Sequence, residues 1–228
     1  MSIVFYDLRG RDDRRFSSHC WRVRLALAHK GLSCETQLVP FSGIGAIGDG
    51  SHRTVPVIRD GDRWLEDSWA IAGYLEDAYP DRPTLFGGAA GRALTAFHLN
   101  WTNRVLQPGL IGFIVKDIHD HLLPEDQAYF RESRERRFGR SLEAVQAGRE
   151  QRLDAFRDSL APLRSTLKRQ PFLGGDAALF ADYLVFGAFQ WARVISPLAL
   201  LAPDDPVGDW FERCLDLHGG LGRSMPAA

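Results

Sequence analysis

Short apolar runs and longer helical patterns alternate along the first third of the chain. Runs rich in β-branched and aromatic residues predict four strands, at 3–6, 34–39, 55–58 and 63–65. Apolar positions three and four residues apart predict two helices, one at 17–30 and one that begins at 67–68 and ends near Tyr79. An Asp-Gly turn joins the last two strands and predicts a hairpin. The expected order is therefore β-α-β followed by β-β-α.

Helical periodicity dominates the rest of the chain. The segment 81–90 (DRPTLFGGAA) combines proline and glycine and predicts a linker. Beyond it, helices are expected at 91–121, 124–148, 150–169, 182–193 and 206–217. These patterns indicate an α+β fold. It consists of a thioredoxin-like βαβ-ββα domain at 1–82, a linker at 83–90 and an all-α helical-bundle domain at 91–228.

Composition and charge limit the function classes. The 228 residues are 45% hydrophobic and 25% charged, which is typical of globular proteins. A net charge of −1 provides no overall field for nucleic acid or acidic membranes, and the mixed-sign run at 131–140 is interpreted as a solvated helix face. No stretch reaches the ~18 apolar residues of a membrane span, and no signal peptide pattern is found. Three widely spaced cysteines without a CxxC motif predict a reduced, cytoplasmic protein.

An ordered set of short motifs resembles the glutathione S-transferase family. In the first domain the motifs are 6–8, 21–22 with 27–31, 54–57, 65–68 with 71–75, and 79–80. In the second domain they are 173–176 and 180–183. Within the family, the chain looks most like the bacterial β-etherase branch and related fungal serine-type transferases. The segments that carry this resemblance are 17–30, 81–83 with 85–86, 142–150, 209–210 and 216–223. The resemblance implies glutathione as cosubstrate without a metal, a small hydrophobic or aromatic second substrate, β-aryl ether cleavage as a candidate reaction, and a homodimer.

Glutathione chemistry requires a group that stabilises the thiolate. A thiol with a pKa of ~8.5 is only a few per cent ionised at pH 7, and a helix N-terminus contributes only ~0.3–1 kcal/mol. A hydroxyl that donates a hydrogen bond to the sulfur anion contributes ~1.5–3 kcal/mol. Ser17 and Ser18 both lie where the first helix begins. The resemblance implies Ser17 as the first choice, because of its spacing from Trp21, and Ser18 as the second. The alternative is that Ser17 is only a helix cap.

Cys20 offers a different chemistry at the same helix end. A helix dipole can activate a thiol one turn into the helix, where it would form mixed disulfides with glutathione. That alternative describes a thiol transferase or lyase. In the other interpretation, Cys20 is a small buried hydrophobic residue. A third hypothesis is a module that binds glutathione or aromatic ligands without turnover.

The resemblance also implies a set of glutathione-binding residues. They are Val55, Pro56, Glu66, Asp67, Ser68, His52 and Arg53. A cis peptide at 55–56 would pair its backbone with the cysteinyl part of glutathione like an added strand. Ser68 would bind the γ-glutamyl carboxylate at a helix N-terminus, with 66–67 facing the ammonium group. One of the basic residues at 52–53 would meet the glycine carboxylate.

The second substrate is expected between the domains, against an apolar wall that carries a few polar groups. The expected lining residues are Trp101, Phe113, Ile114, Tyr129 and Trp191. The arginine-rich loop at 9–15 is interpreted either as a selector of anionic substrates or as a surface loop.

Two further groups of polar residues are given structural interpretations. Asp182 resembles the buried aspartate of a helix capping box, although Leu179 stands where Ser or Thr usually caps. Its expected role is stability. Asp and His residues at 117–121 are of metal-ligand type, but neighbouring side chains on a helix diverge, so this cluster is interpreted as a polar helix end.

Overall fold

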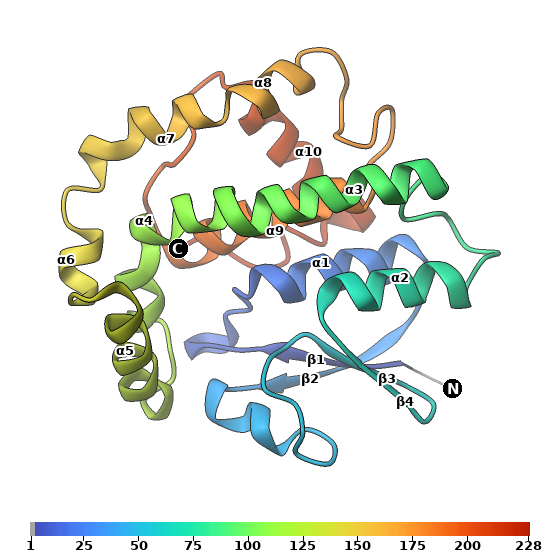
Figure 1. Ribbon diagram of the computed structural model, residues 1–228, viewed down its shortest axis with the longest axis horizontal. Helices are drawn as coiled ribbons and strands as arrows, with labels where there is room; N and C mark the ends of the chain where they lie inside the picture. The colour runs from blue at the N-terminus through green and yellow to red at the C-terminus, as the bar shows by residue number, and fades with distance from the viewer. Residues whose placement is uncertain (1–2) are drawn as a thin grey trace.

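The computed structural model describes residues 3–228 and begins with a four-stranded sheet (Figure 1). Its strands are β1 (Ile3–Leu8), β2 (Cys34–Val39), β3 (Val57–Asp60) and β4 (Arg63–Glu66), in the order β2-β1-β3-β4. β1 pairs parallel with β2 and antiparallel with β3, and β3 pairs antiparallel with β4. Because a parallel pair needs a crossover connection, helix α1 (Ser18–His29) lies between β1 and β2 in the chain. This arrangement confirms the predicted α+β fold.

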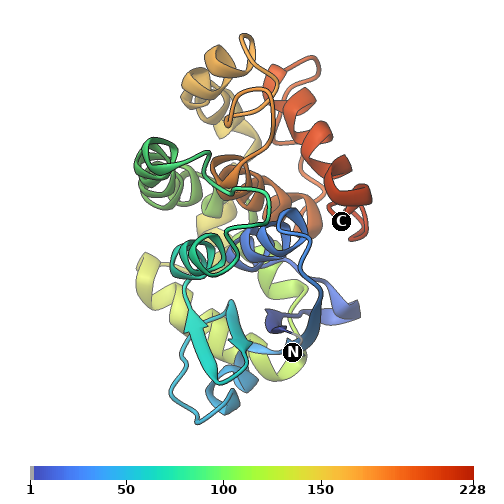
Figure 2. The ribbon, with the colours of Figure 1, turned by 90° about the vertical axis from the view of Figure 1, so that its right-hand side faces the viewer.

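The helical domain follows α2 (Ser68–Ala78) in the chain, and its helices pack around one central helix. Its longer helices are α3 (Ala89–Trp101), α4 (Gln107–Asp120), α5 (Pro124–Phe138), α9 (Phe180–Ile195) and α10 (Pro206–Gly220). Its shorter helices are α6 (Leu142–Gln146), α7 (Leu153–Ser159) and α8 (Ala161–Leu167). Helix α9 is buried along almost its whole length and forms the centre of the domain. Figures 1 and 2 show successive layers: the sheet, then α1 and α2, then α3 and α9, with α7, α8 and α10 outermost.

Three helices that periodicity predicts as continuous are interrupted. The helix expected at 91–121 contains a π-helical turn, Thr102–Leu106, between α3 and α4. The helix expected at 124–148 ends at Gly139, whose φ of 68° lies in the left-handed region. The helix expected at 150–169 begins with a 3₁₀ turn and divides at Leu160, after which α8 carries Pro162 in its first turn.

A glycine in α9 permits close contact between α9 and the start of α1. A Cβ at Gly187 would overlap the backbone carbonyl oxygen of Ser18 and would touch the side chain of Arg22. Trp21 fixes the same end of α1, because its indole packs edge-on against Phe186 of α9, with ring centroids 6.2 Å apart. The beginning of α1 is therefore held directly against the helical domain.

Replacing Gly187 with alanine is expected to destabilise the fold by about 1–3 kcal/mol, because the added methyl group meets backbone rather than a flexible side chain. The same variant should also lower the activity of the protein, since it displaces Ser18 and the adjacent Ser17 at the start of α1. Urea unfolding and steady-state rates measure both effects.

Gly208→Ala in α10 is the matched control for Gly187→Ala, because nothing lies within 4 Å of the position that a Cβ at Gly208 would take. It should keep its activity and gain up to ~1 kcal/mol from better helix propensity; equal effects of the two variants would contradict the packing argument.

Candidate functional site

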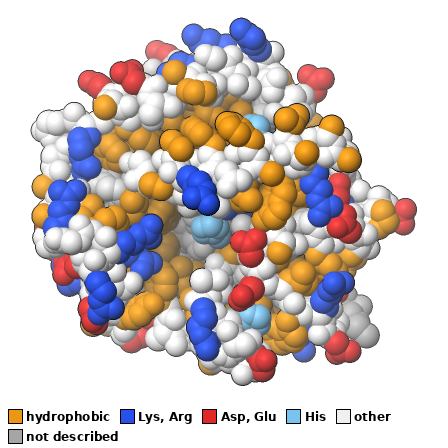
Figure 3. All heavy atoms as spheres, in the orientation of Figure 1, with side chains coloured by type: hydrophobic (Ala, Val, Ile, Leu, Met, Phe, Trp, Pro, Cys, Tyr) orange, Lys and Arg blue, Asp and Glu red, His pale blue; other side chains and the backbone are white. Residues whose placement is uncertain are grey.

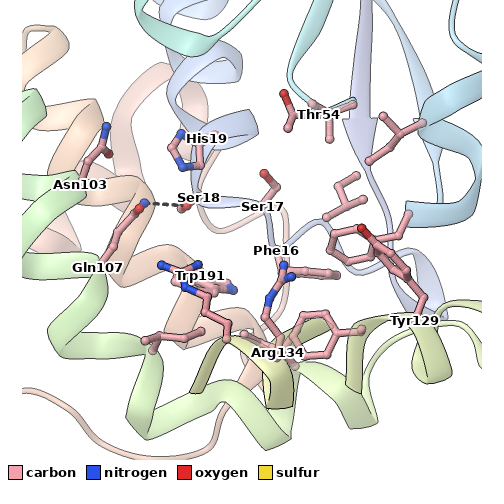
Figure 4. A pocket seen from close by; sticks show the side chains of 18 of the residues that line it. Phe16, Ser17, Ser18, His19, Thr54, Asn103, Gln107, Tyr129, Arg134 and Trp191 are labelled. Carbon is pink, nitrogen blue, oxygen red and sulfur yellow. Dashed lines mark hydrogen bonds between the residues drawn. The ribbon is translucent and has the colours of Figure 1, made fainter. Parts of the chain in front are cut away.

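A cavity of about 470 Å³ lies between the sheet domain and helices α4, α5 and α9. Figure 4 shows side chains that converge on it from the start of α1, the segment before β3, and helices α4 and α5. The polar residues that line it are Ser17, Ser18, His19, Arg53, Thr54, Asn103, Gln107, Arg134 and Arg137. In Figure 3 a hollow near the middle of this face holds a histidine, with basic side chains on one side and acidic side chains on the other.

The two serines at the start of α1 both line the cavity but differ in their contacts. Ser17 is the N-cap residue, and its Oγ accepts a hydrogen bond from the Cys20 backbone N–H at 3.2 Å. A hydroxyl that accepts this bond still has its own proton to donate. The Ser18 hydroxyl is buried and accepts a hydrogen bond from Gln107 Nε2 at 2.8 Å. Capping and donation to a ligand are therefore compatible at Ser17.

Behind the cavity lies a buried arginine network that sequence reasoning missed. Arg22 is fully buried and donates to Asn103 Oδ1 at 2.9 Å and to Ser68 Oγ at 3.4 Å. Its Nη1 also lies 3.1 Å from Nδ1 of His19. Burial, and secondarily the charge of Arg22, lowers the pKa of His19 to about 3, so this cavity-lining imidazole is neutral at pH 7. The only sequence signal was an arginine at an apolar position of the α1 pattern.

The structure argues against Cys20 as the reactive thiol. Its side chain is 1% exposed and is not part of the cavity wall. Burial, followed by the charge of Asp7, raises the pKa of Cys20 well above its usual range. A thiol must ionise to attack, so the geometry favours the interpretation of Cys20 as a small core residue.

Two of the residues predicted to bind glutathione line the cavity, and both come from the segment before β3. The Val55–Pro56 peptide bond is cis, as the sequence indicated, and Val55 lines the cavity together with Thr54 and Arg53. Arg53 donates to the backbone carbonyl oxygens of Gly50 at 2.7 Å and of His52 at 3.0 Å. Its guanidinium is thus held by backbone at the cavity edge.

The acidic residues before α2 do not line the cavity and have structural contacts instead. Asp67 has a φ of 72° and caps α2, and its Oδ1 accepts from the backbone N–H groups of Trp69 and Ala70 at 2.9 and 3.0 Å. Glu66 Oε2 lies 3.0 Å from Nδ1 of His52, which is buried. His52 is therefore engaged with Glu66 and is not part of the cavity wall.

The structure brings only part of the predicted second-substrate wall to the cavity. Phe113 and Ile114 are 3% and 0% exposed and face the core of the helical domain, and Trp101 packs against that core without lining the cavity. Tyr129 and Trp191 do line it, and Tyr129 is 61% exposed. The aromatic residues that sequence reasoning missed are Phe16, Phe41, Phe130 and Phe138. The spacing of Phe130 and Phe138 on α5, eight residues apart, was the available signal.

The remaining polar groups have structural contacts. Asp117 accepts a hydrogen bond from Gln146 Nε2 at 2.8 Å and is paired with Arg149. Within residues 3–228 no group of three or more His, Cys, Asp or Glu side chains is arranged to hold a metal ion. None of the arginines at 9–15 lines the cavity, and Arg14 instead donates to the Val194 carbonyl oxygen at 2.6 Å. In the same described range no helix has the length and apolar character required to cross a membrane.

Curated proteins with similar sequences include plant glutathione S-transferases. "Glutathione S-transferase Z1" of Arabidopsis thaliana is 40% identical over 121 residues, which cover 49% of this chain and 52% of that protein. "Glutathione S-transferase zeta class" of Euphorbia esula is 32% identical over 123 residues, which cover 49% of this chain and 52% of that protein. The matched region thus spans about half the length of these curated relatives.

Similar solved structures include fungal transferases that extend over the whole chain. Glutathione transferase GSTFuA3 from Phanerochaete chrysosporium is 30% identical with a TM-score of 0.77, and the match covers 99% of this chain and 94% of that one. Glutathione S-transferase CsGST63524 of Ceriporiopsis subvermispora, solved in complex with glutathione, is 24% identical with a TM-score of 0.75. That match covers 99% of this chain and 95% of the other, and it shows a shared fold.

Two family profiles match the chain in the order of its two domains. The profile described as "Glutathione S-transferase, N-terminal domain" matches residues 13–83. The profile described as "Glutathione S-transferase, C-terminal domain" matches residues 93–215, which is more than half of the chain. The chain belongs to the glutathione S-transferase family.

Proposed function

We propose that this protein is a glutathione transferase in which the Ser17 hydroxyl stabilises the glutathione thiolate. The observation that carries the proposal is the position of Ser17 at the N-terminus of α1, on the cavity wall, with its oxygen already accepting from Cys20 N–H. Its proton can therefore point toward a ligand sulfur. The helix N-terminus adds a favourable potential for the anion.

The tripeptide would lie along the edge of the sheet domain. No hydrogen bond from the N–H or C=O of Val55 to another residue in the range 3–228 is found, so both groups can pair with the cysteinyl backbone. The γ-glutamyl carboxylate would bind at Ser68, where the charge of Arg22 adds attraction, and the ammonium group would face 66–67. Arg53 would meet the glycine carboxylate.

The electrophile would bind against the aromatic side of the cavity. In the candidate reaction, the thiolate attacks the carbon that carries an aryloxy group next to a ketone. A C–S bond forms, the C–O bond breaks, and the electron pair leaves with a phenolate that takes a proton from water. The thiol proton goes to solvent when glutathione ionises. A phenolate leaves readily, so ionisation and positioning of the sulfur carry the reaction.

The test is phenol release from a chromogenic β-aryl ether ketone with and without glutathione, alongside the melting temperature with glutathione added. Release that depends on glutathione supports the transferase and the ether reaction. Stabilisation by glutathione without release would retain the binding site and exclude this ether as a substrate; conjugation of other electrophiles would then be measured. A chain that glutathione neither stabilises nor activates would contradict the proposal.

We further propose that the chain forms a homodimer through the outer face of α3. Leu94, Phe97 and Val105 on α3 and the following turn are 69%, 70% and 51% exposed. Large apolar side chains grouped on one helix face are typical of protein contact surfaces. The partner that would cover this face is a second copy of the chain, because members of the family usually form dimers across both domains. Sedimentation equilibrium of the wild type measures the oligomeric state, and a monomer at micromolar concentration would contradict the proposal.

A further inference from the structure

One face of α5 turns two arginines toward the cavity. Phe130, Arg134, Arg137 and Phe138 follow the i, i+4, i+7, i+8 spacing of a single helix face, and all four line the cavity. Figure 4 shows Arg134 extending from α5 between Trp191 and Tyr129. The interpretation of the run 131–140 as a solvated face holds for Arg137, which is exposed at the cavity mouth, but Arg134 is half-buried against the cavity.

Two other arginines of this helix are paired with glutamates. Arg131 binds Glu135 and Glu143 at 2.8 and 2.9 Å, and Arg136 binds Glu132 at 2.6 Å. Within residues 3–228, neither Arg134 nor Arg137 has a carboxylate at ion-pair distance. Arg134 and Arg137 thus line the cavity without a paired carboxylate among the described residues.

The cavity itself supplies no negative charge to balance them. Among the described residues, none of those that line it is an aspartate or a glutamate. Burial, and then the neighbouring charge of Arg137, lowers the pKa of Arg134, as expected for two cations without an anion between them. The Arg134 guanidinium remains charged at pH 7, because an arginine side chain is effectively always protonated in proteins.

The contacts of Arg134 leave its hydrogen-bonding edge available. The guanidinium lies over the Phe130 ring, with Cζ 4.7 Å from the ring centroid, and Nη1 donates to Ser133 Oγ at 2.9 Å. Stacking uses the face of the guanidinium, while its remaining N–H groups lie along the edge. That edge matches the two oxygens of a carboxylate.

We propose that the second substrate is an aromatic carboxylate, whose ring packs among the aromatic side chains of α5 and α9 and whose carboxylate is bound by Arg134 and Arg137. The inference deepens the proposed function, on which it rests for turnover. Arg53, which lies in the segment before β3, remains the candidate for the glycine carboxylate of glutathione. The carboxylate of the second substrate and the glycine carboxylate of glutathione would thus bind to different arginines.

A matched pair of electrophiles tests this assignment. One is an aryl phenacyl ether that carries a para carboxylate on its acyl ring, and the other is the methyl ester of the same compound. The wild type should have a higher kcat/KM for the acid. In Arg134→Gln and Arg137→Gln the ratio of acid to ester should fall about ten- to hundredfold, as expected for loss of a charged hydrogen bond. Arg136→Gln is the control, because Arg136 is 76% exposed and paired with Glu132.

A binding measurement separates this inference from the proposed function. Calorimetry with 4-phenoxybenzoate and its methyl ester requires no turnover and no glutathione. Tighter binding of the acid that is lost in the Arg134→Gln, Arg137→Gln double variant supports the site even if no ether is cleaved. Equal affinity for acid and ester, or a loss in the double variant that is the same for both, overturns the carboxylate site while leaving the transferase intact. A rise in KM for glutathione alone would assign these arginines to the tripeptide instead and would also overturn the proposal.

Discussion

Replacing Asp182 with alanine is expected to destabilise the protein by about 3–5 kcal/mol, because four buried donors lose their acceptor together. Asp182 is completely buried, and its two carboxylate oxygens accept from four N–H groups. The donors are the backbone N–H of Leu173 at 2.7 Å, of Gly174 at 2.9 Å and of Leu179 at 3.0 Å, and the indole of Trp210 at 2.8 Å. The carboxylate thus joins the loop before α9, the start of α9, and α10.

Thermal unfolding measures this effect. For a chain of this size, 3–5 kcal/mol corresponds to a fall in Tm of roughly 6–20 °C. The Tm of Asp182→Asn should fall less, because the amide oxygen still accepts hydrogen bonds. Some loss remains, because the amide NH₂ group faces other N–H groups. This variant keeps the test available if Asp182→Ala does not fold. Asp158→Ala is the matched control, because Asp158 is exposed near the end of α7, and it should change stability by less than ~0.5 kcal/mol. A loss below 1 kcal/mol in Asp182→Ala would contradict the network argument.

The capping box at this helix illustrates what one sequence can predict. Leu179 has no side-chain oxygen, so the Asp182 N–H donates to the Leu179 backbone carbonyl oxygen at 2.9 Å, while the Asp182 carboxylate accepts from the Leu179 N–H at 3.0 Å. The incomplete box was visible in the sequence. The indole of Trp210 as a fourth donor was not, because Trp210 follows 28 residues later on another helix.

The sheet and the first two helices could be predicted because their signals are local. The run of apolar residues in β1, the Asp-Gly turn and the caps of α1 and α2 each act within a few residues. The breaks in the helical domain were harder, since periodicity continues through Gly139 and Leu160. In these places backbone geometry, rather than the apolar pattern, ends the helix.

The site was predicted less completely because its residues are chosen by tertiary packing. Phe113 and Phe130 are both aromatic residues on helices, yet the first faces the core and the second the cavity. The rotation of α4 and α5 decides this, and it depends on contacts from distant segments. Asp126 shows one of them, since its carboxylate accepts from the backbone N–H groups of Phe41 and Ser42 at 2.9 and 2.8 Å and fixes α5 against the sheet domain.

Ser17→Ala is expected to slow glutathione conjugation about 10- to 100-fold near pH 7. The hydroxyl would contribute ~1.5–3 kcal/mol to the thiolate, which corresponds to about one to two pKa units of the bound thiol. Removing a donor to the charged form raises that pKa, so the thiolate fraction falls at neutral pH and recovers as the pH rises. The deficit should therefore shrink in alkaline buffer. Ultraviolet absorbance of bound thiolate, titrated against pH, measures the shift directly.

Three further variants separate sulfur stabilisation from helix capping at Ser17. Ser17→Thr keeps both the cap and the donor and should retain most of the rate. Ser17→Asp is an equally good N-cap without a donor at neutral pH, so stability should hold while the rate falls. Ser18→Ala removes the neighbouring hydroxyl that accepts from Gln107. If Ser18→Ala raises the thiol pKa and Ser17→Ala does not, the donor is Ser18; if neither moves it, the thiolate is held by the helix N-terminus and backbone alone.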